Sequence, residues 1–410
     1  MGNETIRKIA DHGVIRGDIV SCSGGGCIAF YYRSPYTFFE KLRTDESGKT
    51  REIELFAPLK KYSLDPITEQ QPYAEYTIYV EAEGYEPASV AGIEILPGVT
   101  SLQKVHLHPK NEEYHPDINV ISGHTLYEKY PPKMMEDEIQ PMEETGEIVL
   151  HHVVVPEYII VHDGPPKDDT AKNYYVPYMD YIKNVACSEI YATWPENTIR
   201  ANVLAIMSFT LNRVYTEHYR NKGYDFTITS STAYDQKWIH ERNIFDTISD
   251  AVEDLVGKYL SRPGVKQPIL TQYCDGRYVQ CPNGMSQWGS MSLGEQGYST
   301  MEILRYYYGN DIYINTAPDM EGIPSSWPGY TLEIGSRGEK VKHVQEELNR
   351  IADAYPAIPE IEADGIYGKR TAETVRVFQN VFRLPETGKV DFRTWFKISQ
   401  IYVGVSKMIG

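Results

Sequence analysis

The chain has 410 residues, of which 41% are hydrophobic, and a formal net charge of −17 at pH 7. This length suits about three domains of a soluble globular protein. An acidic surface repels nucleic acid and anionic membranes, so neither is expected as a partner. No apolar run approaches the roughly 18 residues of a membrane-spanning helix. The N-terminus, MGNETIRKIADHG, lacks the apolar core of a classical signal peptide.

Residues 14–108 are predicted to form an all-β domain. Apolar and polar residues alternate in YTIYVEA, residues 76–82, and again in residues 92–109, as in strands with one buried face. Turn signals such as Pro97-Gly98 separate these runs. The segment carries no cluster of catalytic side chains, so we expect it to be a folded accessory or pro-domain.

Residues 109–157 are interpreted as a linker. The segment contains several prolines, an acidic stretch at residues 136–138 and little hydrophobic periodicity. A linker of this kind is exposed and open to proteolysis. The apolar run VLHHVVVPEYIIVHDG, residues 149–164, then predicts the strand with which the next domain begins.

Residues 158–315 are predicted to form an α+β domain. Apolar residues at helical spacing predict helices over residues 199–219 and 244–260, separated by the polar strand or loop FTITSSTAYDQ. A third helix is expected over residues 299–308, because its start carries the Ser-x-x-Glu pattern of a capping box.

Residues 330–410 are predicted to form a small helical module. Asp364-Gly365 marks a tight turn before its second long helix. Two apolar stripes at helical spacing mark the helices, namely Val341, Val344, Leu348 and Ile351, and then Thr371, Val375, Phe378 and Phe382.

The chain has five cysteines, so at least one is unpaired within it. Cys22 and Cys27 flank a glycine run, and Cys274 and Cys281 flank a short turn. Either pair could close a small disulfide loop, and reduced, buried cysteines are the alternative. Cys187 stands alone. No group of ligands has the spacing of a zinc site, so we expect no metal and no cofactor.

Two segments carry the candidate active site. YIKNVACSEIYATWPENTIRANVLAIMSFTLNRVY, residues 181–215, places Glu189 before a tryptophan-bearing turn and a long apolar helix. NGMSQWGSMSLGEQGYSTMEILRYYYG, residues 283–309, is a glycine-punctuated loop that leads into a helix. One acid, a glycine-rich wall and many aromatic residues suit the cleavage of a sugar polymer, in which a carboxylic acid protonates the leaving oxygen. Tyr191 and Trp194 could desolvate Glu189 and so raise its pKa.

The two segments resemble the SpoIID/LytB family of bacterial peptidoglycan lytic transglycosylases, in which Ser-Glu precedes Trp-Pro and GMSQ(Y/W)G closes the domain. The resemblance implies that Glu189 acts first as acid and then as base on the sugar's own 6-hydroxyl, which closes a 1,6-anhydro ring without water. It also implies that substrate is bound by Tyr191, Trp194, Gly284, Met285, Ser286, Gln287, Trp288 and Gly289.

The chain departs from this family in two places. The family helix reads AQAVAARTYAL, whereas this chain reads ANVLAIMSFTLNRVY, with Arg213 and Tyr215 as candidates for the place of Arg-Thr-Tyr. Some members bind zinc through cysteines and a histidine after this helix. Here TITSSTAYDQKWIHER contains His240 but no cysteine, so no such metal is expected. Three further histidines are interpreted as ordinary surface or strand residues: His151, His152 and His162.

The flanking domains also carry resemblances. LEIGSRGEKVKHVQEELN, DGIYGKRTAETVRVFQ and LPETGKVDFRTW resemble the three-helix peptidoglycan-binding domain. The pattern TDESGKT, APLKKYSL and YTIYVEAEGYEP resembles the carboxypeptidase-regulatory-like β-sandwich. The whole arrangement resembles the SleC family of clostridial spore cortex-lytic enzymes. It implies cortex peptidoglycan as substrate, location in the spore, and a zymogen that a subtilisin-like germination protease cuts in the linker.

Two other functions stay open at this point. The central domain could be a non-catalytic scaffold that holds peptidoglycan, given its departures from the family helix. It could also be a glycoside hydrolase that uses a second carboxylate, for which Asp235 and Asp275 are the candidates. The hydrolase would release reducing-end sugar, and the transglycosylase would release anhydro-sugar.

Overall fold

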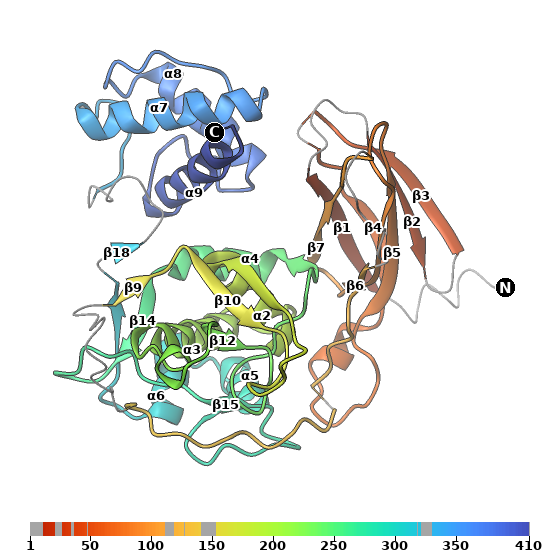
Figure 1. The fold of residues 1–410 in the computed structure, drawn as a ribbon, viewed down its shortest axis with the longest axis vertical. Helices are drawn as coiled ribbons and strands as arrows, with labels where there is room; N and C mark the ends of the chain where they lie inside the picture. The colour runs from red at the N-terminus through yellow and green to blue at the C-terminus, as the bar shows by residue number, and fades with distance from the viewer. Residues whose placement is uncertain are drawn as a thin grey trace. The chain divides into compact units, whose positions relative to one another are not determined.

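The computed structural model describes residues 11–20, 27–33, 37–46, 48–110, 119–126, 128–140, 153–317, 319–320 and 330–409. The protein is mixed α+β with several domains (Figure 1). This confirms the predicted class, a multidomain α+β protein. It divides into two compact units. One comprises Met1–Val20, Ile28–Leu42 and Thr50–Met320, and the other comprises Ser21–Cys27, Arg43–Lys49 and Glu321–Gly410. No helix among the described residues has the length and apolarity to span a membrane.

The N-terminal part of the first unit contains two β-sheets. In β5 the side chains of Tyr76, Ile78 and Val80 are buried while their neighbours are partly exposed, which is the alternation predicted from sequence. One sheet has the order β13(Ile244–Phe245), β7(Thr100–His106), β1(Asp11–Val20), β4(Ile53–Ala57). The other has the order β3(Thr37–Arg43), β2(Ile28–Arg33), β5(Ala74–Glu81), β6(Ala88–Ile95), β8(Asn119–Val120).

The β-domain and the central domain are joined by strand pairing and by a buried ion pair. Strand β13 belongs to the central domain in sequence, yet it pairs antiparallel with β7 of the β-domain. Beside this pairing, the Arg242 guanidinium lies 2.8 Å from the Glu94 carboxylate, and both side chains are at most 1% exposed. The second oxygen of Glu94 accepts the backbone N–H of His124 at 3.0 Å. Separating the two domains would therefore leave a buried charge without its partner.

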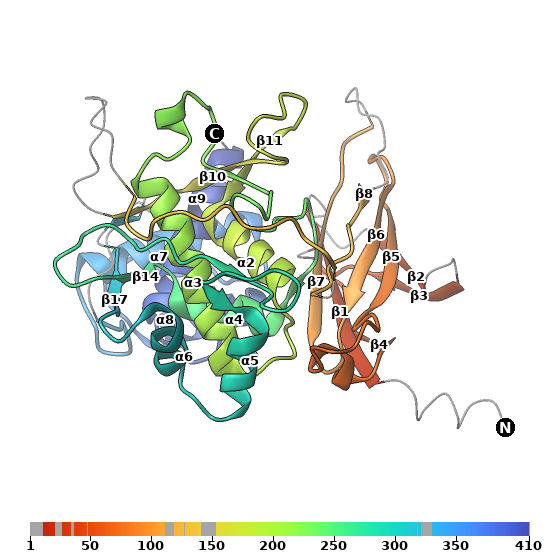
Figure 2. The ribbon, with the colours of Figure 1, turned by 90° about the horizontal axis from the view of Figure 1, so that it is seen from below.

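The predicted linker, residues 109–157, is described in part, and that part is not free of the central domain. Residues 119–126 and 128–140, which we call the strap, run as an extended trace along the central domain (Figures 1 and 2). Met134 donates its backbone N–H to Ala233 at 2.7 Å, and the Glu138 carbonyl accepts the N–H of Leu270 at 2.9 Å. The strap is thus held by the domain that it crosses.

The central domain is built around helix α3 (Glu196–Tyr215), which Figure 2 shows among the other helices of this domain. Most of its side chains are buried on every face, as expected for a helix at the centre of a domain. Its helices are α2(Tyr178–Glu189), α3, α4(Asp246–Leu255), α5(Gln287–Glu295) and α6(Thr300–Tyr308), with a short 3₁₀ turn η2(Arg220–Lys222). Its strands are β9(Val154–Val155), β10(Tyr158–His162), β11(Asn173–Pro177), β12(Ile228–Thr229), β14(Lys258–Ser261), β15(Tyr273–Cys274), β16(Met285–Ser286), β17(Tyr313–Thr316) and β18(Asp319–Met320).

Helix boundaries follow from local chemistry. α3 begins after Pro195, which lacks a backbone N–H to continue a helix upstream. α4 ends earlier than predicted because Gly257, at φ +73°, turns the chain into β14. The capping box predicted for α6 is confirmed, since the Ser299 side chain accepts from the Glu302 N–H and the Glu302 carboxylate accepts from the Ser299 N–H.

The described part of the C-terminal module, residues 330–409, contains the long helices α7(Glu339–Ala354), α8(Lys369–Val381) and α9(Phe392–Ile409). The predicted stripes are buried, except that Phe382 lies at the end of α8 and is only half-buried. The buried Gln345 side chain accepts the N–H of Gly365 at 2.8 Å and donates to Asp364 at 3.0 Å. This glutamine fixes the tight turn that the sequence placed before α8.

Glu347 makes the stability of this module depend on pH. Its side chain is buried, and burial raises its pKa to about 7 although the Ser399 hydroxyl donates to it at 3.4 Å. A folded pKa above the unfolded value stabilises the module fully below about pH 4.5, and this contribution is lost as pH rises through about 7. We expect the free energy of unfolding to fall by about 1–3 kcal/mol over this range.

The substitution Glu347→Gln should remove most of this dependence. Hydrogen exchange of the α7–α9 amides at pH 5 and pH 8, corrected for the intrinsic exchange rate, would measure it. The neighbouring Glu346 is exposed, so Glu346→Gln is the matched control and should leave the dependence unchanged. Equal pH dependence in Glu347→Gln and the parent would contradict the prediction.

Candidate active site

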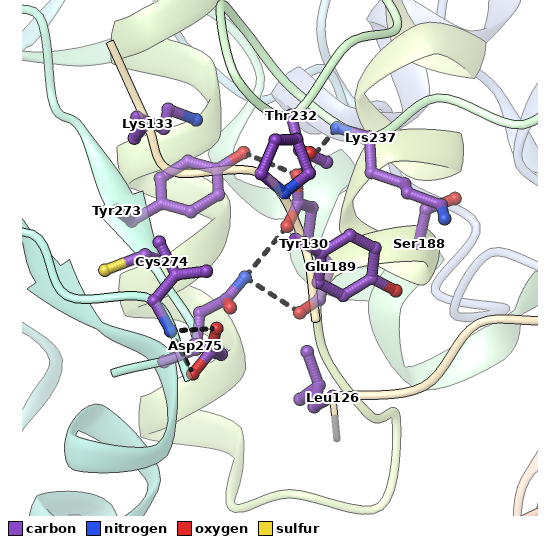
Figure 3. Close-up of a pocket in the computed structure, with 13 residues that line it drawn as sticks. Leu126, Tyr130, Lys133, Ser188, Glu189, Thr232, Lys237, Tyr273, Cys274 and Asp275 are labelled. Atoms are coloured by element: carbon purple, nitrogen blue, oxygen red, sulfur yellow. Dashed lines mark hydrogen bonds between the residues drawn. The ribbon is translucent and has the colours of Figure 1, made fainter. Parts of the chain in front are cut away.

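A cavity of about 40 Å³ lies against Glu189 (Figure 3). Its walls come from four parts of the chain that are distant in sequence: the end of α2, residues 232–237, residues 273–287 and the strap. The lining residues are Leu126, Tyr130, Pro131, Lys133, Ser188, Glu189, Thr232, Lys237, Tyr273, Cys274, Asp275, Val279 and Gln287.

The carboxylate of Glu189 is fixed from two sides. Its Oε1 accepts the backbone N–H of Lys237 at 2.6 Å, and the Tyr273 hydroxyl lies 3.5 Å from the same oxygen. Its Oε2 accepts from the Gln287 side-chain amide at 2.9 Å, and that amide also donates to the Glu189 carbonyl at 2.9 Å (Figure 3). Only 8% of Glu189 is exposed, so these neutral donors replace water around the acid.

Burial raises the pKa of Glu189 above its usual value. The charge of Lys133, the Lys237 N–H and the Gln287 amide oppose this effect because each favours the carboxylate. The net rise is the direction that a general acid needs, since the group must be protonated near neutral pH to donate a proton.

The three aromatic residues predicted to bind substrate form a cluster and do not line the cavity. Ring centroids lie 5.9 Å apart for Tyr191 and Trp194, 6.0 Å for Tyr191 and Trp288, and 5.1 Å for Trp194 and Trp288. Their exposed fractions are 2%, 4% and 8% for Tyr191, Trp194 and Trp288. The Trp194 indole N–H donates to the Ser63 carbonyl at 2.8 Å, in the short 3₁₀ turn η1(Lys60–Ser63) of the β-domain. The cluster makes an apolar support for the turn that follows Glu189.

The predicted glycine loop reaches the cavity through Gln287. Strands β15 and β16 pair in parallel. Gln287 follows β16 directly as the first residue of α5, where its side chain reaches the Glu189 carboxylate. Ser286 caps α5, because its hydroxyl accepts the Gly289 N–H at 2.9 Å. Met285 is fully buried. An added Cβ at Gly284 would lie 2.6 Å from the Gln272 backbone carbonyl, so close backbone packing requires this glycine. At Gly289 an added Cβ would lie 2.1 Å from the Tyr307 hydroxyl, so the Tyr307 side chain would have to move.

The other two candidate carboxylates differ in position. The Asp235 carboxylate is 0% exposed and accepts from Arg213 at 2.8 Å and from Tyr219 at 2.6 Å. Burial alone would raise the pKa of Asp235, but Arg213 and these hydrogen bonds lower it. Asp235 does not line the cavity, and Arg213 is committed to this ion pair. Asp275 does line it, and its carboxylate accepts backbone N–H groups from residues 277–279.

The loop that carries Asp275 is closed by a disulfide between Cys274 and Cys281. Cys187 is a buried free thiol, and burial raises the pKa of this thiol to about 11. Cys22 lies outside the described residues, so its predicted pairing with Cys27 is not described.

His162 and His240, which the structure describes, both pack against aromatic rings. His162 stacks on Phe226 and bonds Asn173 at 2.8 Å, and His240 stacks on Tyr174. No three His, Cys, Asp or Glu side chains in the described part of the chain lie together as a metal site would require. His151 and His152 fall outside the described residues.

Sequence reasoning missed most of the lining residues, among them Tyr130, Lys133, Lys237 and Tyr273. Tyr130 and Lys133 belong to a segment whose prolines and acidic residues predicted an exposed linker. The signal that was present is TLYEKYPPKMM, residues 125–135, whose tyrosines and methionines are unusual in a solvated linker.

Gly276 allows the approach of the Asp275 loop to β16. Its φ is +78°, and an added Cβ would lie 1.9 Å from the Ser286 hydroxyl oxygen. We expect Gly276→Ala to lower the free energy of unfolding by more than about 1 kcal/mol, because both the backbone conformation and the contact are incompatible with alanine. Gly264 also has a positive φ of +73°, but no atom lies near its added Cβ. Gly264→Ala is therefore the matched control that measures the cost of the backbone conformation alone. Denaturant unfolding of both variants would test this, and equal losses would contradict the steric part.

The fold and site define an α+β protein with one buried glutamic acid in a cavity, followed by a three-helix module. Residues 167–261 match the family model SpoIID, described as Stage II sporulation protein. Residues 337–398 match PG_binding_1, a peptidoglycan binding domain. These two matches fall on the regions in which the sequence resembles the two families, and they confirm both resemblances. The SpoIID match contains Glu189 and Lys237 and ends before Gln287.

The search of solved structures found limited likenesses. The SleB N-terminal domain is 25% identical, with 19% of this chain and 99% of that chain covered and a TM-score of 0.17. The 3-chlorocatechol 1,2-dioxygenase from Rhodococcus opacus 1CP is 15% identical, with 24% and 60% covered and a TM-score of 0.17. At these TM-scores neither structure bears on fold or function. The comparison with curated proteins found no match.

Proposed function

We propose that this protein is a peptidoglycan lytic transglycosylase that degrades spore cortex glycan during germination, with Glu189 as its single general acid and base. The proposal is carried by Glu189 itself, which is one carboxyl group at a cavity wall with a pKa raised by burial. The SpoIID match around it and the peptidoglycan-binding match downstream support the choice of substrate.

The reaction needs one proton and no water. Protonated Glu189 gives its proton to the glycosidic oxygen as the bond from that oxygen to C1 breaks. The resulting carboxylate takes the proton of the 6-hydroxyl of the same sugar, whose oxygen bonds to C1 and closes the 1,6-anhydro ring. Glu189 ends protonated, as it began. The Lys237 N–H and the Gln287 amide hold the carboxylate in one orientation and stabilise it while it is charged.

The C-terminal module would keep the enzyme on its polymer. Binding of one site to a strand raises the effective concentration of the same strand at a second site on the same chain. As part of the proposal, the protein is made as a zymogen in the spore, and a subtilisin-like protease activates it within residues 109–157.

The test is mass spectrometry of glycan fragments released from decoated spore cortex in H₂¹⁸O, before and after limited subtilisin treatment of the protein. We expect 1,6-anhydro-muramic ends that carry no ¹⁸O. Binding to cortex without release, in both treatments, would instead support a non-catalytic scaffold.

A two-carboxylate hydrolase is the second candidate, because Asp275 lines the same cavity as Glu189. It predicts reducing ends that contain ¹⁸O, and it predicts that Asp275→Asn abolishes release. Under the transglycosylase mechanism, Asp275→Asn should keep anhydro products, since that mechanism has no step for Asp275.

A further inference from the structure

The strap supplies part of the wall in front of Glu189. Leu126, Tyr130, Pro131 and Lys133 all line the cavity, and Figure 3 shows Leu126, Tyr130 and Lys133 among the side chains that surround it together with Glu189. The cavity volume is about 40 Å³, whereas sites for drug-sized ligands occupy roughly 300–1,000 Å³. One water molecule needs about 10–15 Å³ on this measure. On this measure the cavity has space for a few water molecules, which is less than a sugar ring needs.

Strap residues also contact Lys237, which lines the cavity, and Tyr191 and Asp235, which lie outside its lining. The Lys237 ammonium lies 4.9 Å from the centroid of the Tyr130 ring. The Leu126 N–H donates to the Tyr191 hydroxyl at 2.9 Å. The Lys133 ammonium donates to the Asp235 carbonyl. These contacts hold the strap against the cavity that Glu189 lines.

Lys133 has an electrostatic effect on the acid as well. Its side chain is half-buried, and its ammonium lies 5.0 Å from the centroid of the Tyr273 ring. Its charge is the largest influence that opposes the rise in the pKa of Glu189. A positive charge favours the carboxylate, and a carboxylate has no proton to donate. The strap therefore both fills the site and favours the ionised form of its acid.

Both ends of the strap are anchored outside the cavity. At one end, the His124 N–H bonds the buried Glu94 of the β-domain at 3.0 Å. At the other end, Glu136 forms two bonds to Arg213 at 2.6 and 2.9 Å, and Glu138 forms two bonds to Arg262 at 2.7 Å each. Lifting the middle of the strap from Glu189 therefore requires that one of these ends be freed.

We propose that the strap is an inhibitory segment that covers Glu189 in the intact chain and must be displaced before glycan can bind. The inference rests on the proposed function, because it assigns regulation to the same site. It places the inhibitory contact at Leu126, Tyr130, Pro131 and Lys133, and the β-domain acts as an anchor for one end of the strap.

The experiment uses the full chain and two readouts. The first is labelling of the Glu189 carboxyl by a carbodiimide with glycinamide, followed as a rate by peptide mass spectrometry. The second is glycan release from decoated cortex. We expect Tyr130→Ala/Lys133→Ala to label Glu189 at least tenfold faster than the parent and to release glycan at least tenfold faster. Lys129 is an exposed strap residue outside the lining, so Lys129→Ala should match the parent in both readouts.

The two readouts separate this inference from the proposed function. Faster labelling of Glu189 without glycan release from any variant would support the proposal that the strap covers Glu189. It would overturn the proposal that the protein is a transglycosylase. Unchanged labelling, or release by the parent as fast as by the double variant, would overturn the strap inference. If the double variant loses its thermal unfolding transition, Glu138→Gln replaces it, because it weakens an anchor outside the cavity. Labelling of that variant at the parent's rate would also overturn the inference.

Discussion

Glu189→Gln is expected to lower the rate of glycan release by about 10³-fold while leaving the fold intact, within the usual range for loss of a general acid. Glutamine has the same shape, and its carbonyl oxygen can still accept the Lys237 N–H that now bonds Oε1 at 2.6 Å. It cannot donate a proton to the glycosidic oxygen or take one from the 6-hydroxyl. The comparison is best made in the Tyr130→Ala/Lys133→Ala background, where the site is expected to be open.

The control is Glu196→Gln, which removes a carboxylate whose side chain is 81% exposed at the start of α3. It should keep the parent rate. A rate for Glu189→Gln within tenfold of its parent would mean that another group supplies the proton, and Asp275 would be the first to examine because it lines the cavity.

The same acid sets the direction of the pH dependence. Because burial raises the pKa of Glu189, its protonated form persists to higher pH than in an exposed glutamate. We expect the rate of release to fall as pH rises through this raised pKa. The measurement is the initial rate in the double-variant background from pH 4 to pH 9. A rate that rises steadily with pH would contradict the assignment of Glu189 as the acid.

Sequence alone selected Glu189 as the candidate acid because its signal is local, and the structure places this residue in a cavity wall. Glu189 stands five residues before Trp194, and this spacing identifies it without any contact information. The function of Gln287 was only half predictable. Its motif marked it as a site residue, but the bond to Glu189 joins residues 98 apart in sequence. No local pattern shows which side chain a loop will meet at that separation.

Helix α2 was not predicted, for a physical reason. Its polar residues Asp180, Lys183, Asn184 and Ser188 recur at helical spacing, but all of its side chains except Asp180 are buried, so this stripe is not a solvent-exposed face. For the strap, the sequence prediction and the structure differ in the opposite sense. Its composition predicted solvent exposure, yet Lys133 and Glu136 are held by partners from other elements, Asp235 and Arg213. Composition reports the average preference of a segment, whereas single long-range hydrogen bonds and ion pairs decide its place here.

Aromatic residues near the acid show a further limit of sequence reasoning. Tyr191, Trp194 and Trp288 suit both sugar stacking and core packing, and their types cannot separate these uses. Here they lie 2–8% exposed in one cluster. We therefore propose that these three side chains help to exclude water from Glu189. Direct stacking on a sugar would require the cluster to open.

Arg213→Leu is expected to destabilise the central domain by about 3–5 kcal/mol, the usual cost of removing one partner of a buried ion pair. The Arg213 side chain is 0% exposed and lies 2.8 Å from Asp235, which is also 0% exposed, and 2.6 Å from Glu136. Without the guanidinium, the Asp235 charge stays buried with only neutral donors. Denaturant unfolding followed by tryptophan fluorescence would measure the loss, since Trp194, Trp238 and Trp288 lie in this domain.

Arg200→Leu is the matched control, because Arg200 pairs with Asp254 at 3.0 Å on the surface of the same helix, with side chains 28% and 37% exposed. Exposed pairs contribute about 0–1 kcal/mol, so its loss should be small. A loss below about 1 kcal/mol for Arg213→Leu would contradict the buried-pair argument. Because Arg213 also anchors Glu136, the variant should label Glu189 faster than Arg200→Leu does under native conditions. Destabilisation without faster labelling would mean that the Glu138 anchor holds the strap over Glu189 without help from Glu136.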